Sequence, residues 1–154
     1  MSTILALDMA TLTGFAVIID GVVCESGEWD FGRVDGEHYG HMFRKLEDNL
    51  SKYDLYNLDT VAYEMAHHRA GPATRIGVGM NAVVLMYAAK HNINLCSAHT
   101  ATLKKWATGN GKAKKPAIMA WASEKTERDI IHDNEADAIL VGLYAYSLTR
   151  VDPF

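Results

Sequence analysis

The fold of this 154-residue chain is decided by residues 3–31, whose sequence is TILALDMATLTGFAVIIDGVVCESGEWDF. Three runs rich in apolar residues within this stretch predict β-strands at 4–7, 15–19 and 22–31. Asp20-Gly21, between the second and third runs, is a strong signal for a two-residue hairpin turn. The chain is therefore expected to begin as a three-stranded antiparallel meander.

Helix and strand patterns alternate through the rest of the chain. Near residue 36 the period changes, and Met42, Leu46 and Leu50 recur at helical spacing as far as about residue 53. Further strands are predicted at 60–64 and 94–97, and further helices at 73–90, 100–106, 115–125 and 134–148. A strand, a long helix and another strand are typical of a crossover into a parallel sheet. The sequence thus predicts one α/β domain over residues 1–154, whose mixed five-stranded sheet has three antiparallel and then two parallel strands and is flanked by helices.

Charge is unevenly distributed along the chain. The 15 Lys and Arg and the 19 Asp and Glu give a formal net charge of −4. Yet the 59 residues from 65 to 123 contain eight Lys or Arg and no acid, while the rest of the chain carries a charge of −12. This pattern favours a surface that binds a polyanion, although an ordinary solvated basic surface would produce it too.

Composition argues against a membrane or exported protein. No apolar run approaches the ~18 residues of a membrane span, and no basic region precedes the N-terminal apolar stretch. We therefore expect a soluble, cytoplasmic protein with no membrane partner. Cys24 and Cys96 lie outside any motif of zinc-binding spacing. We expect both to be reduced residues of the core.

Three acidic residues lie in apolar surroundings, where a carboxylate is costly unless it is paired or binds a metal. Asp8 ends the first predicted strand, Glu64 ends the fourth, and Asp137 interrupts an apolar helix. Each alone could be an ordinary surface acid. A right-handed crossover would, however, place the first and fourth strands side by side. We therefore expect the three carboxylates to converge at one edge of the sheet.

An oxygen-only cluster of this kind predicts a divalent cation. Neighbouring carboxylates repel one another unless a cation offsets their charge, and sites without Cys or clustered His favour Mg²⁺ or Mn²⁺ over zinc. Two such ions are the usual machinery of phosphodiester hydrolysis. Asp133 and Asn134 lie on either side of Asp137 around the helix, so each is a candidate for a further ligand.

These motifs resemble those of the RuvC-type Holliday junction resolvases, which belong to the RNase H-like superfamily. The resemblance rests on LALD at 5–8 with TGFAV at 13–17, VAYE at 61–64 and NEADAI at 134–139. It implies an RNase H-like fold and a homodimeric endonuclease that cuts branched DNA, four-way junctions above all. It also implies that Asp8, Glu64 and Asp137 are catalytic metal ligands for Mg²⁺, two ions in each active site, with Mn²⁺ able to substitute.

The acid-free stretch contains the segment that corresponds to the DNA contacts of that family. LKK at 103–105 and GNGKAKK at 109–115 resemble its lysine-bearing region, so the resemblance places Lys104 and Lys115 as the supporting catalytic lysines. Lysines beside a phosphate supply charge and position rather than sequence reading. We expect DNA contacts from Arg69, Arg75, Lys104, Lys105, Lys112, Lys114 and Lys115.

Two departures from the family pattern bear on the site. Met9-Ala10 stand where the family has Pro-Gly, and Asn134 occupies the place of its fourth ligand, an Asp or His. An amide brings no charge, so one metal could bind more weakly, or Asp133 could substitute. These departures and the compact length favour a phage-encoded member that acts in the host cytoplasm.

Other functions fit parts of the same pattern. A junction-binding module with a degenerate site would explain Asn134, and a ribonuclease H would use the same carboxylates on an RNA/DNA hybrid. Asp8, Thr13 and Gly14 also fit the phosphate-binding start of the actin and sugar-kinase superfamily. Those proteins need two such lobes and a far longer chain, so the length argues against that assignment.

Overall fold

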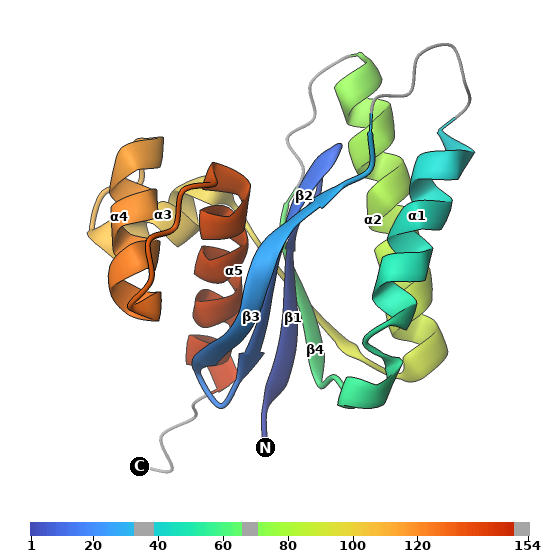
Figure 1. The fold of residues 1–154 in the computed structure, drawn as a ribbon, viewed down its shortest axis with the longest axis horizontal. Coiled ribbons are helices and arrows are strands. Elements are labelled where there is room, and N and C mark those ends of the chain that lie inside the picture. Colours follow the sequence, from blue (N-terminus) through green and yellow to red (C-terminus); the bar gives the residue numbers. More distant parts are fainter. Residues whose placement is uncertain (33–38, 66–70, 150–154) are drawn as a thin grey trace.

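A computed structural model describes residues 1–32, 39–65 and 71–149 of the chain (Figure 1). The elements, in chain order, are β1 (Thr3–Asp8), β2 (Leu12–Ile19), β3 (Val22–Asp30), α1 (Gly40–Ser51), the 3-10 helix η1 (Asp54–Tyr56), β4 (Thr60–Glu64), α2 (Pro72–His91), β5 (Asn94–Ala98), α3 (Thr100–Thr108), α4 (Lys115–Thr126) and α5 (Asp133–Thr149). Every predicted strand and helix is present, with bounds shifted by a few residues, and η1 is an addition.

The five strands form one sheet in the order β3-β2-β1-β4-β5. β1 and β3 each pair with β2 antiparallel, while β4 runs parallel to both β1 and β5. The predicted mixed sheet is therefore confirmed. Because β4 lies directly beside β1, the carboxyl ends of these two parallel strands meet at the same edge of the sheet.

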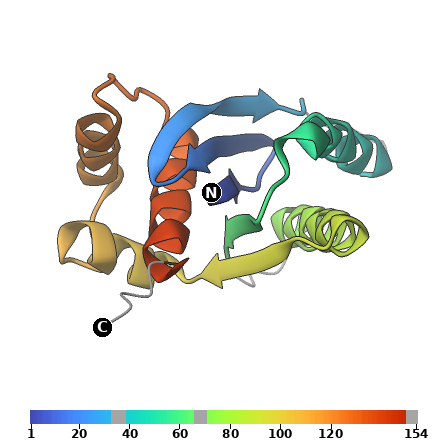
Figure 2. The ribbon, with the colours of Figure 1, turned by 90° about the horizontal axis from the view of Figure 1, so that it is seen from below.

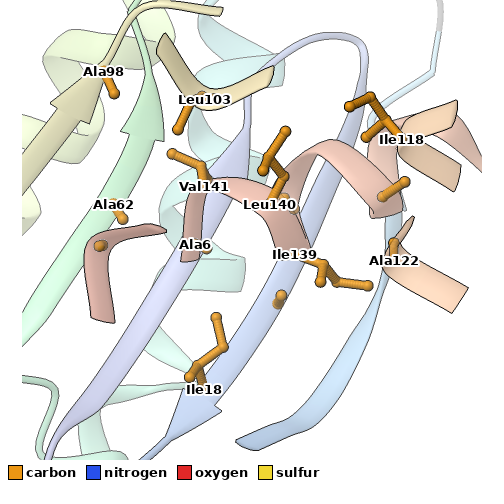
Figure 3. Close-up of a cluster of buried hydrophobic side chains, with 14 of the residues drawn as sticks. Ala6, Ile18, Ala62, Ala98, Leu103, Ile118, Ala122, Ile139, Leu140 and Val141 are labelled. Atoms are coloured by element: carbon orange, nitrogen blue, oxygen red, sulfur yellow. The ribbon is translucent and has the colours of Figure 1, made fainter. Parts of the chain in front are cut away.

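Helices cover both faces of the sheet. α1 and α2 lie on one face, and α3, α4 and α5 lie on the other (Figures 1 and 2). Side chains alternate along each strand, so β1 sends Ala6 to the α5 side and Leu5 to the side of α1 and α2. On the α5 side, Ala6 and Ile18 pack with Ile139 (Figure 3). Two separate hydrophobic cores thus fix β1 from both faces.

The two cysteines differ in their place, because Cys96 packs against the core on the α5 side and Cys24 does not. Cys24 is exposed and Cys96 is half-buried, and both are free thiols. The prediction that both are core residues is wrong for Cys24, because β3 is an edge strand whose residues are all at least partly exposed. Among the described residues, no helix is long and apolar enough to cross a membrane.

Candidate active site

The carboxyl ends of β1 and β4 bring two of the predicted acids together. Leu7 pairs with Tyr63 in the parallel ladder, so Asp8 and Glu64 follow as the last residues of neighbouring strands. The first turn of α5, which precedes Asp137, lies at the same end of the molecule (Figure 1). The backbone thus supplies the convergence that the sequence pattern predicts.

Burial and the charges of neighbouring acids raise the pKa values of both Asp8 and Asp137. Burial, followed by the charges of Asp137 and Glu64, raises the pKa of Asp8 to about 8. Burial, followed by the charges of Glu64 and Asp133, raises the pKa of Asp137 to about 7. At neutral pH the folded protein therefore disfavours the charged form of both groups, and a bound cation would offset the cost of ionising them.

The turn after Asp8 is fixed by Thr13, which is fully buried. Its hydroxyl donates to the carbonyl oxygen of Ala10 at 2.6 Å and accepts from the Ala10 N–H at 3.3 Å. The next residue, Gly14, pairs with Asp8 across the β1–β2 ladder. A Cβ atom on Gly14 would lie 1.8 Å from the backbone oxygen of Asn134. The start of α5 therefore packs directly on β2 beside Asp8.

The first turn of α5 is also anchored to β3. Glu135 is 6% exposed and accepts a hydrogen bond from the Ser26 hydroxyl at 2.7 Å. Arg128, in the α4–α5 connection, lies 3.4 Å from the same Glu135 carboxylate oxygen. Glu135 and Asp137 lie on nearly opposite sides of the helix, so this anchor leaves Asp137 facing the other acids.

Of the two candidates for a further metal ligand, Asp133 already forms an ion pair with Lys115. Its Oδ2 lies 2.7 Å from Lys115 Nζ, and this hydrogen bond lowers the pKa of Asp133. Asn134 is half-buried and is the residue whose backbone meets Gly14. Both residues belong to the first turn of α5, as expected.

The positive charges of two of the predicted lysines lower the pKa values of the acids. Lys104 in α3 and Lys115 at the start of α4 both lower the pKa of Asp137, and Lys115 also lowers that of Asp8. Exposed basic side chains of the predicted DNA surface are those of Arg75, Lys105, Lys112, Lys114 and Lys115. Arg69, together with His67 and His68, lies outside the described residues.

A cavity of about 170 Å³ opens beside the acids. Its lining residues are Asp8, Met9, Tyr63, Glu64, Met65, Gly77 and Asn81. Among the described residues, Asn81 Oδ1 is buried and has no hydrogen-bond partner. The sequence pattern did not predict this contribution of α2, because it depends on how that helix packs across the β1–β4 edge.

A second unpredicted contact involves Thr100. α3 begins at Thr100 and its N-cap is His99, so neither Thr100 nor Thr102 caps the helix. The Thr100 hydroxyl instead donates to Glu64 Oε1. The spacing of the sequence gives no signal for this contact, because it depends on the β4–β5 register.

The donor chemistry of the site fits a hard divalent cation. In the ranges that the structure describes, no group of three or more His, Cys, Asp and Glu side chains is arranged to hold a metal ion by itself. Carboxylates repel one another, so they are not expected to adopt the spacing of a metal site unless a cation lies between them. Asp8, Glu64 and Asp137 nevertheless offer only oxygen donors, which Mg²⁺ and Mn²⁺ prefer.

The raised pKa of Asp8 makes the stability of the metal-free protein depend on pH. Between about pH 4 and pH 8 only the folded state holds the proton on Asp8, so the free energy of unfolding falls as pH rises through this window. In EDTA, Asp8→Asn should reduce this fall to the part that Asp137 contributes and stabilise the protein at pH 8 by several kcal/mol, because each unit of pKa shift is worth about 1.4 kcal/mol. Chemical denaturation at several pH values between 5 and 9 measures both effects.

Asp48→Asn is the matched control, since Asp48 is exposed on α1. It should keep the pH slope of the wild type. An Asp8→Asn protein with an unchanged slope would contradict the burial and charge repulsion described for Asp8.

The strand order, the helices on both faces and the acids at the β1–β4 edge define an RNase H-like fold. No protein-family model matches the chain. In sequence, the chain is 28% identical over 111 residues to the crossover junction endodeoxyribonuclease RuvC of Brachyspira hyodysenteriae, which covers 71% of this chain and 68% of that protein.

Solved structures show the same fold. The Thermus thermophilus RuvC structure matches with a TM-score of 0.79 at 16% identity, over 95% of each chain. T. thermophilus RuvC in complex with a Holliday junction substrate matches with a TM-score of 0.81 at 16% identity, over 97% of this chain and 98% of that one. The resemblance to RuvC-type resolvases is thus confirmed in both sequence and fold.

Proposed function

We propose that this protein is a structure-specific endonuclease that resolves Holliday junctions and related branched DNA, such as arises in recombination and repair. The observation that carries the proposal is the convergence of Asp8, Glu64 and Asp137 at one edge of a RuvC-like sheet. The raised pKa values of Asp8 and Asp137 support it further, because such strained carboxylates are typical of functional sites.

In this proposal Asp8, Glu64 and Asp137 hold two Mg²⁺ ions, with Mn²⁺ able to substitute. Asn134 or Asp133 completes the ligand set. Two divalent ions in such a site activate the attacking water and stabilise the leaving oxygen, which leaves 5′-phosphate and 3′-hydroxyl ends. Asp133 would have to break its ion pair with Lys115 before it could bind a metal ion, so this ion pair favours Asn134 as the fourth ligand.

The basic residues provide the DNA-binding surface. Lys104 and Lys115 lie close enough to act on the acids, so they are the residues that would offset charge at the scissile phosphate. The remaining DNA contacts in the proposal come from Arg69, Arg75, Lys105, Lys112 and Lys114. Such contacts fix the position of the backbone and carry no sequence information themselves.

A homodimer is part of the proposal, since two paired cuts need two sites. The described part of α2 exposes three large apolar side chains. Val78 is 53% exposed, Leu85 is 40% exposed and Met86 is 73% exposed. Val78 and Leu85 are seven residues apart and so lie on one face of the helix. A partner subunit would cover this apolar face.

The proposal also includes the setting of the enzyme. The chain would act as a single nuclease domain over residues 1–154, in the cytoplasm, where unprotected DNA junctions lie. Asn134, in the place of the family's charged fourth ligand, favours a phage-encoded enzyme that works in the cytoplasm of its host.

A comparison of three substrates tests the proposal. With Mg²⁺, a mobile four-way junction should be cut by paired, symmetric nicks, at least about 100-fold faster than a linear duplex of the same sequence or an RNA/DNA hybrid. Rapid cleavage of the hybrid would instead identify a ribonuclease H. Tight junction binding without any cleavage would identify a binding module with a degenerate site.

A further inference from the structure

The first residue of α3 reaches back to the end of β4. Glu64 pairs with Ala98 across the parallel β4–β5 ladder, and the N–H of Met65 donates to the Ala98 carbonyl oxygen at 2.8 Å. His99 continues the chain in extended form, with φ −75° and ψ 145°. This route places Thr100 against the carboxylate of Glu64, 36 residues earlier in the chain.

The hydroxyl of Thr100 serves this contact rather than helix capping. A capping hydroxyl belongs to the N-cap residue and accepts a hydrogen bond from an N–H of the first turn. In α3 the N-cap is His99, and Thr100 is the first helical residue. Thr100 Oγ1 donates to Glu64 Oε1, and a hydroxyl has one proton to donate. The donation therefore fixes one oxygen of Glu64.

We propose that Thr100 is a positioning residue for the metal site, and that its hydroxyl holds Glu64 in the orientation that presents the carboxylate to a divalent cation beside Asp8. This inference rests on the proposed function, because it takes Glu64 as a metal ligand. A free Glu side chain samples several rotamers, and an anchor on Oε1 removes much of that freedom before the cation arrives. Removal of a group that orients a metal-ligating carboxylate typically weakens metal affinity or activity about 10–100-fold.

Three variants separate positioning from structural support. Thr100→Val keeps the shape of the side chain and removes the hydroxyl, while Thr100→Ser keeps the hydroxyl. Thr102→Val makes the same change at an exposed position in the same turn of α3. Mn²⁺ binding is measured without DNA, by the electron paramagnetic resonance signal of the free ion, and the melting temperature is measured in EDTA.

Thr100→Val should bind Mn²⁺ at least about 10-fold more weakly than the wild type. Thr100→Ser should bind within about threefold of the wild type, and Thr102→Val should match it. All the melting temperatures in EDTA should agree within a few degrees, because a part-buried hydroxyl contributes little to stability.

Wild-type affinity in Thr100→Val would overturn the inference and leave the proposed function intact. Loss of affinity that Thr100→Ser does not restore, together with a lower melting temperature, would also overturn it and assign Thr100 to structural support. A wild type that cuts junctions in Mg²⁺ but does not bind Mn²⁺ would contradict the inference alone. A wild type that neither cuts junctions nor binds Mn²⁺ would contradict the proposed function as well.

Discussion

Asp8→Asn is expected to reduce junction cleavage at least about 100-fold while junction binding is kept. Burial and its acidic neighbours raise the pKa of Asp8 to about 8, against about 7 for Asp137. An amide in its place would keep the shape of the side chain but weaken the hold on a divalent cation, and groups that act on transition-state charge typically contribute this much to the rate. Cleavage kinetics and gel-shift titration on a four-way junction measure the two effects.

Binding should survive, or even strengthen, because the substitution removes a negative charge from a surface that meets phosphates. Asp48→Asn makes the same change of charge on α1 and should cut at the wild-type rate. Cleavage by Asp8→Asn at the wild-type rate would contradict the assignment of the active site. The same variant is expected to be more stable than the wild type at pH 8, so the protein gives up stability to keep this carboxylate.

Gly14→Ala is expected to lower the free energy of unfolding by about 1–3 kcal/mol or more and to reduce cleavage about 100-fold. The added Cβ atom would lie 1.8 Å from the backbone oxygen of Asn134 and 2.3 Å from its carbonyl carbon. These are backbone atoms, so no side-chain rotation relieves the clash, and the first turn of α5 has to move away from β2. Asp137 follows directly after that turn, so the displacement should also move Asp137 relative to Asp8 and Glu64.

Gly77→Ala is the matched control for stability. Gly77 lies within α2, and a Cβ atom there would meet nothing within 4 Å. The substitution should leave the free energy of unfolding unchanged or raise it by up to about 1 kcal/mol, because alanine is the better helix former. Chemical denaturation compares the two variants. A Gly14→Ala protein as stable and as active as the wild type would contradict the close packing of α5 on β2.

The placement of Asp8 and Glu64 could be predicted from the sequence because it depends on topology alone. The crossover rule sets β4 beside β1, and each strand ends at its acid. Asp137 could be predicted because a carboxylate within an apolar helix needs a partner. Local patterns were sufficient for each of these residues.

Contacts that depend on exact register could not be predicted. Glu135 looks like one more charged residue at a helix start, yet it is buried against Ser26, which is 109 residues away. Thr100 looks like a cap, yet it reaches Glu64 because Ala98 pairs with Glu64 in the next strand. In both cases the partner is set by the assembled sheet, and nothing in the neighbouring sequence identifies it.

The three acids come from β1, β4 and α5, and α5 is the last element of the fold. A ribosome therefore releases Asp137 after every other part of the proposed site has been made. A nascent or prematurely terminated chain that lacks α5 would have only two of the three carboxylates. It would also lack the helix that packs on β1 and β2. Under the proposed function, a copy that stops before α5 lacks one of the three metal ligands and is not expected to cut.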